Sequence, residues 1–139
     1  MLEAVERAEA PLAERRWAAA AHLASLCGLW VLPSSVVAPV LIGLLKRKSP
    51  YVRHHAKGSF CFQACFVLFE VVVEVAARSV VEDIQTGNLA SGKLLVVMAA
   101  GSVFVMVLPI AWAVLVLHAG IQAWAGKWYR YPLIGRLIR

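Results

Sequence analysis

Cysteine is scarce in this sequence. Three of the 139 residues are cysteines, Cys27, Cys61 and Cys65, and each lies inside or at the edge of an apolar segment. An odd number of cysteines placed in this way argues against a framework of disulfide bonds. We therefore expect these side chains to be small buried hydrophobes.

Charge is also scarce. Charged residues make up 16% of the chain, and the 24-residue run from Leu94 to Leu117 contains none. A helix needs roughly 20 apolar residues to cross a bilayer. Hydrophobic residues reach 61% of the chain, compared with about 45–50% in soluble proteins. These values exclude a soluble globule and predict an integral membrane protein.

The short motifs of common enzymes are missing. The chain has no GxGxxG, Walker loop, HExxH or CxxC sequence, so we expect no enzymatic activity and no cofactor. Two membrane histidines, His22 and His118, are chemically suited to haem ligation, but hydrogen bonds between helices are the favoured interpretation. A metal site at His54, Cys61 and Cys65 is disfavoured because all three lie on one segment.

Basic residues outnumber acidic ones by 14 to 8, giving a formal net charge of +6. They lie beside apolar segments, and the connection from Lys46 to Lys57 alone holds five of them. This arrangement favours a topology signal and attraction to anionic lipid headgroups, and it excludes nucleic acid as a partner.

The pattern predicts an all-α integral membrane bundle of four helices. Trp17–Leu32 and Val36–Leu45 form a short hairpin broken at Pro33, Ser34 and Ser35, with a re-entrant hairpin or one kinked helix as alternatives. The third helix begins at the Ser49 cap and Pro50 and runs to about Ile84. The last is Leu94–Leu117, with Pro109 inside it.

Three regions follow from this pattern. Residues 1–16 form an amphipathic N-terminal segment without the appearance of a signal peptide, residues 17–121 the transmembrane domain, and residues 122–139 a basic, aromatic interfacial tail. With four crossings, the terminal regions and the Lys46–Lys57 connection share one side and hold 12 of the 14 Lys and Arg residues. The positive-inside rule makes that side cytoplasmic, in a multi-pass protein of the cell (inner) membrane.

Polar residues recur along one face of the third helix. Glu70, Glu74 and Arg78 follow at intervals of four, and Gln63 precedes Glu70 by seven residues. Two hypotheses remain open. The first is an internal Glu74–Arg78 pair, with Glu70 hydrogen-bonded to a neighbouring helix or across an oligomer interface. The second is a path for protons or ions, or a site for a substrate's cationic group.

A second set of residues lies where the basic connection and the tail meet the headgroups. These residues predict a lipid or partner interface: Arg53, His54, His55, Lys57, Arg130 and Tyr131. Headgroup contact and helix packing are the simpler interpretation, and a docking site for lipid phosphate or a protein is the sharper one.

Short motifs in a fixed order cover nearly all of residues 16–138. They are Trp17-Ala18, Ala21-His22-Leu23, Ala38-Pro39, Leu44-Leu45-Lys46-Arg47, Ser49-Pro50-Tyr51-Val52, His55-Ala56-Lys57, Phe62-Gln63 and Arg130-Tyr131-Pro132-Leu133. This set resembles a bacterial family of small membrane proteins of unknown function. That family is similar to the twenty-kilodalton subunit of the chloroplast inner-envelope translocon and to MamF-type magnetosome membrane proteins.

The resemblance implies a four-helix membrane domain without established catalytic activity. Cys61 departs from the family pattern, which commonly has Asn there. The resemblance and the residue pattern together favour a non-enzymatic membrane component that serves as a scaffold or in assembly or translocation. Its partners would be further copies of itself or other membrane proteins. The alternative is a small proton- or ion-coupled transporter that uses Glu70 and Glu74.

Overall fold

The computed structural model describes residues 10–29, 32–87 and 91–132. In these residues the chain forms four α-helices, one 3-10 helix and no strand. The elements are α2 (Leu12–Leu23), η1 (Ala24–Leu29), α3 (Leu32–Leu45), α4 (Pro50–Gln85) and α5 (Ser91–Trp124). The prediction of an all-helical chain with four helices is confirmed.

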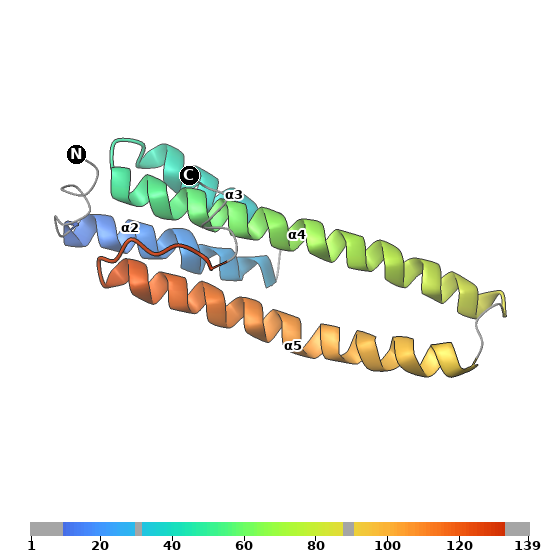
Figure 1. Cartoon of the computed structure of the whole chain (residues 1–139). Coiled ribbons are helices and arrows are strands. Elements are labelled where there is room, and N and C mark those ends of the chain that lie inside the picture. The colour runs from blue at the N-terminus through green and yellow to red at the C-terminus, as the bar shows by residue number, and fades with distance from the viewer. Residues whose placement is uncertain (1–9, 30–31, 88–90, 133–139) are drawn as a thin grey trace.

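The two long helices determine the shape of the molecule. At 1.5 Å per residue, the 36 residues of α4 extend over about 54 Å and the 34 residues of α5 over about 51 Å. They run in opposite directions, and the shorter elements α2, η1 and α3 lie against one half of this pair (Figure 1). The other half projects beyond them as two arms, which are the part of α4 from Gln63 onward and the part of α5 up to Trp112.

The α2–α3 hairpin is present but is short. Its tip, at Gly28 and Ser35, lines the same cavity as Gln63 of α4. From Gln63, α4 continues for about 28 Å to Glu82. Because Gln63 lies about 20 Å from the start of α4, which is about 54 Å long, the hairpin ends little more than one third of the way along α4.

The hairpin also turns at a different place from the predicted one. The sequence predicted a corner at Pro33, Ser34 and Ser35, but α3 already begins at Leu32, so this placement is wrong. Proline is tolerated in the first turn of a helix, because the N–H that it lacks would have no helical partner there. The first helix also begins earlier than predicted, at Leu12 just after Pro11.

The predicted start of α4 is confirmed. Ser49 is the N-cap, its hydroxyl oxygen accepts a hydrogen bond of 3.2 Å from the Val52 amide, and Pro50 occupies the first turn. Such a cap satisfies one of the amides that a helix start leaves without a partner. The end of α4 at Gln85 agrees with the predicted end, whereas α5 extends beyond Leu117 to Trp124.

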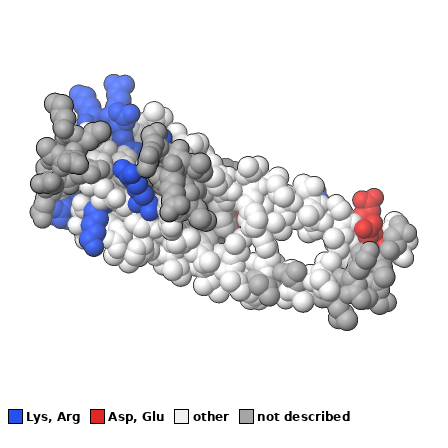
Figure 2. Space-filling view, in the orientation of Figure 1, with Lys and Arg blue, Asp and Glu red and all other residues white. Residues whose placement is uncertain are grey.

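Charge is separated along the molecule. In Figure 2, Lys and Arg side chains gather at the end that carries the α3–α4 turn, and acidic side chains gather at the far end of α4. The residues at that far end include Glu82 and Asp83, and the surface between the two ends is mostly apolar. Residues 1–9 and 133–139, which belong to the predicted N-terminal segment and tail, lie outside the described residues.

Candidate functional site

Three buried aromatic side chains meet inside the molecule near the basic end: His22 of α2, His55 of α4 and Tyr131 of the tail. We call them the histidine cluster. His22 Nε2 lies 3.0 Å from His55 Nδ1, and His22 Nδ1 lies 3.0 Å from the Tyr131 hydroxyl. All three side chains are less than 5% exposed. The cluster therefore joins residues that are far apart in the chain at one point of the core.

One arrangement of hydrogen atoms satisfies both contacts of the cluster. Burial raises the pKa of Tyr131, with a smaller contribution from Tyr129, so the phenol keeps its proton. If the phenol donates to His22 Nδ1, His22 carries its hydrogen on Nε2 and donates to His55 Nδ1. His55 then carries its hydrogen on Nε2, which lies towards the Lys127 backbone but forms no hydrogen bond of normal geometry with any residue that the structure describes.

His22 is held in its neutral form. Burial, and to a smaller extent the charge of His54, lower the pKa of His22 from 6.5 to about 4. A neutral imidazole can accept from Tyr131 and donate to His55 at the same time, whereas a protonated one would lose its acceptor. The arrangement is thus suited to fixing the tail and α2 to α4 at neutral pH.

A second polar contact secures the tip of the hairpin. Pro39 has no N–H, so the carbonyl group of Ser35, four residues earlier in α3, lacks its usual helical donor. The Ser25 hydroxyl of η1 donates to this carbonyl at 3.2 Å and lies 3.3 Å from the Ser59 hydroxyl of α4. Ser59 in turn donates to the Ala21 carbonyl at 2.9 Å.

The predicted polar face of α4 divides into two parts. Gln63 is fully buried, and its Oε1 accepts a hydrogen bond of 2.9 Å from the Trp112 indole of α5. Arg78 and Glu74 form an exposed ion pair. The pair foreseen by the first hypothesis is present, but no hydrogen bond joins Glu70 to another described residue.

The three residues Gln63, Glu70 and Glu74 line one cavity between the arms. We call it the central cavity; its volume is about 430 Å³ and its opposite wall includes Val105, Pro109 and Trp112 of α5. Figure 2 shows an opening between the arms in the half beyond the hairpin. Gln63 Nε2 is buried without a hydrogen-bond partner in the described part of the chain.

The predicted lipid or partner interface also divides. Arg53, Lys57 and Arg130 are exposed and His54 is half-buried, with Nε2 3.1 Å from the Tyr129 carbonyl oxygen. His55 and Tyr131 lie inside the molecule as members of the histidine cluster. The hypothesis of a lipid or partner interface is therefore restricted to the exposed residues Arg53, Lys57 and Arg130.

Sequence reasoning found some of these contacts and missed others. The predicted hydrogen bond of His22 to another helix is confirmed, but the one predicted for His118 is wrong, because its ring bonds Gln122 of the same helix at 3.4 Å. The His22–Tyr131 contact and the Ser25–Ser59 contact were missed. A proline four residues after Ser35 was the available signal for an unsatisfied carbonyl group.

The site offers packing and hydrogen bonding, and the described residues hold no group of three or more His, Cys, Asp or Glu side chains that could bind a metal ion. The family model of the magnetosome magnetite crystal formation proteins, MamF/MmsF, matches residues 13–138 of the chain. No curated protein and no solved structure matches the chain.

Proposed function

Because the chain belongs to the MamF/MmsF family of magnetosome magnetite crystal formation proteins, we propose that it is a non-enzymatic integral membrane protein that serves magnetite formation as a scaffold. In this proposal it assembles with further copies of itself in the membrane. The basic end, with both termini, lies on the cytoplasmic side. The similarity to the chloroplast translocon subunit stays a prediction.

The exposed apolar surface of the arms is the observation that carries this proposal. α4 and α5 are long and apolar enough to cross a membrane. In the most apolar 18-residue stretch of each helix, only 6% and 12% of the residues are buried. The core helix of a soluble protein would be mostly buried, and a signal sequence would lie near the N-terminus. Apolar surface of this extent requires lipid or a protein partner.

The arms define the two proposed crossings. α4 has no Lys or Arg between Lys57 and Arg78, and the described part of α5 up to Leu117 has no charged residue beyond Lys93. From Lys57 to Glu82 the helix rises by about 37 Å, which exceeds a hydrocarbon core of about 30 Å. The basic residues at one end then fit the cytoplasmic headgroups.

The central cavity supports assembly with a second copy. It is a space of about 430 Å³ that the hairpin does not reach far enough to fill. Helices in membranes associate by close packing and interhelical hydrogen bonds. A second chain that packs against the arms would cover this space and supply partners for Gln63 and Glu70.

Cysteine cross-linking tests the assembly. In a chain without its native cysteines, Val105→Cys places a thiol in the cavity wall, and Ile110→Cys places one on an equally exposed part of α5 outside it. We expect oxidation in native membranes to give disulfide-linked dimers with Val105→Cys and not with Ile110→Cys. Monomers with both variants, together with one chain per nanodisc, would contradict assembly through the cavity.

Transport is the second candidate function. The observation that favours it is the buried Gln63 Nε2, which has no hydrogen-bond partner among the described residues, beside Glu70 and Glu74 in the central cavity. Proton or cation flux into liposomes that disappears with Glu70→Gln and persists with Glu82→Gln would favour a transporter. An absence of flux, with intact cross-linked dimers, leaves the scaffold as the function.

A further inference from the structure

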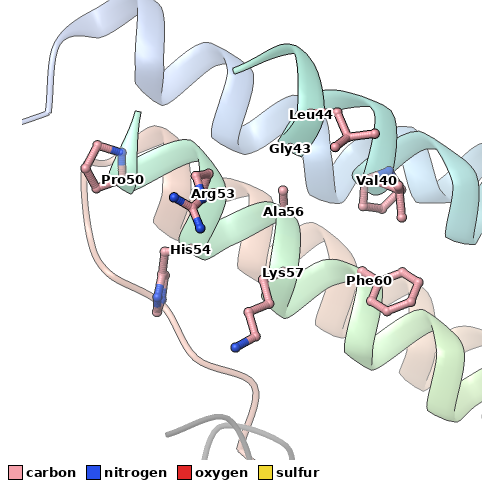
Figure 3. A pocket seen from close by; sticks show the side chains of 10 residues that line it. Val40, Gly43, Leu44, Pro50, Arg53, His54, Ala56, Lys57 and Phe60 are labelled. Carbon is pink, nitrogen blue, oxygen red and sulfur yellow. The ribbon is translucent and has the colours of Figure 1, made fainter. Parts of the chain in front are cut away.

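A groove opens on the outer face of the basic end, between the second half of α3 and the first turns of α4. Its volume is about 450 Å³. Its lining includes Val40, Gly43 and Leu44 of α3 and Arg53, Lys57 and Phe60 of α4. Figure 3 shows the α4 residues in order from Pro50 to Phe60, with Val40 and Leu44 of α3 on the other side.

The close approach of two small residues shapes this groove. A Cβ atom placed on Gly43 would lie 3.1 Å from the Ala56 Cβ, so α3 and α4 are in contact at this point. The larger side chains of Val40, Leu44 and Phe60 stand at its sides and are exposed. The groove thus has a tight floor and apolar walls.

The groove changes from cationic to apolar along its length. Arg53 and Lys57 lie one helical turn apart on α4, and Phe60 follows on the side towards the arms. Both cationic side chains are exposed, and neither forms an ion pair or hydrogen bond with any residue that the structure describes. His54 lies at the rim of the groove. Its Nε2 donates a hydrogen bond to the Tyr129 carbonyl oxygen of the tail, since a carbonyl oxygen can only accept.

We propose that this groove binds one anionic phospholipid, with its phosphate at Arg53 and Lys57 and its upper acyl chain against Val40, Leu44 and Phe60. Charge complementarity selects the headgroup, since guanidinium and ammonium groups are the usual ligands of phosphate oxygens. The apolar walls select a lipid over a soluble phosphate. The inference rests on the membrane placement proposed above, which puts the cationic end of the groove at headgroup level.

The test measures lipid retention by the full-length protein. The protein in detergent is equilibrated with equimolar phosphatidylglycerol and phosphatidylcholine of matched acyl chains, and native mass spectrometry counts the lipids retained. We expect the wild-type chain to retain one phosphatidylglycerol in preference to phosphatidylcholine. The double variant Arg53→Gln and Lys57→Gln should lower this affinity roughly 30-fold.

Two further variants separate a built site from general attraction. Arg47→Gln with Lys48→Gln removes the same charge from neighbouring exposed positions outside the groove, and it should lower retention less than about threefold. Val40→Trp keeps both cations but fills the apolar end, and it should lower retention at least about fivefold. Equal losses in the two charge variants would overturn the proposal, because they indicate diffuse attraction.

Other outcomes also contradict the inference. Displacement of phosphatidylglycerol by millimolar inorganic phosphate would indicate a site for free phosphate, and equal retention of phosphatidylcholine would indicate a site without charge selection. A protein partner that protects Arg53 and Lys57 while no lipid is retained would make the groove a protein interface. Release of the chain from membranes by alkaline carbonate would instead contradict the membrane placement itself.

Discussion

His22 illustrates how much a single position depends on residues that are distant in the chain. Its two ring nitrogens contact His55, 33 residues away, and Tyr131, 109 residues away. The sequence favoured a hydrogen bond between helices for His22 but placed His55 and Tyr131 at a lipid or partner interface. They are buried because the tail folds back over α2 and α4. No local sequence pattern predicts this contact.

Stability should fall at acidic pH through His22. Its pKa is 6.5 in the unfolded chain and about 4 in the folded one, so the unfolded state binds the proton first as the pH falls. The contribution is complete above pH 6.5 and is lost as the pH falls to about 4. Between pH 7.5 and 5 we expect His22 to account for a loss of about 2 kcal/mol, beside the loss from His55, whose pKa burial lowers as well.

Thermal unfolding in detergent at these two pH values measures the effect. In His22→Gln the difference between the two melting temperatures should shrink, because the titrating group is absent. His118→Gln serves as the control and should keep the wild-type difference. An unchanged difference in His22→Gln would show that other groups cause the acid sensitivity.

At the scale of elements, the hairpin tip shows what packing adds to a pattern. Pro33 predicted a corner, yet α3 runs from Leu32 to Leu45 through both Pro33 and Pro39. The chain tolerates Pro39 because Ser25 satisfies the carbonyl group of Ser35 from outside the helix. The start of α4 was predictable from Ser49 and Pro50, since capping depends on neighbours in the sequence.

Gly28 should be the critical small residue of this tip. A Cβ atom on Gly28 would lie 2.5 Å from the Ser35 Cβ, and no flexible side-chain end is available to move aside. Gly28→Ala should therefore destabilise the protein by about 1–3 kcal/mol. Denaturant or thermal unfolding in detergent measures this loss.

Gly58 provides the matched control for that substitution. A Cβ atom on Gly58 meets nothing within 4 Å, so Gly58→Ala should stabilise α4 by up to about 1 kcal/mol through helix propensity. If both substitutions destabilise the protein equally, the close contact at the hairpin tip is not the cause.

At the scale of the whole molecule, the hairpin is short and the arms are long. Composition alone does not distinguish this arrangement from one with four full crossings. The sequence predicted four crossings with a re-entrant hairpin as an alternative. In the structure two helices are long and apolar enough to cross a membrane, and the hairpin ends near Gln63. In the proposed membrane placement, a hairpin of this depth would enter the bilayer from the basic side and return to the same side.

Labelling with a membrane-impermeant maleimide tests this topology. Arg47→Cys should react from the cytoplasmic side and Asp83→Cys from the opposite side, each in a chain without native cysteines. Cys27, kept as the sole cysteine, should react from neither side of an intact membrane, because the proposed placement puts the hairpin tip in the hydrocarbon core. Reaction of Cys27 from the same side as Asp83→Cys would demonstrate four full crossings.

The sequence by itself determined the helical class, the membrane as the surrounding phase, the start of α4 and the basic end. These features depend on composition, on the length of apolar runs and on neighbouring residues, all of which are local. Only the tertiary structure decided the depth of the hairpin, the histidine cluster and the groove beside Arg53 and Lys57. Those features depend on how α3 and the tail pack against α4, and the contacts that fix this packing join residues separated by tens of positions in the chain.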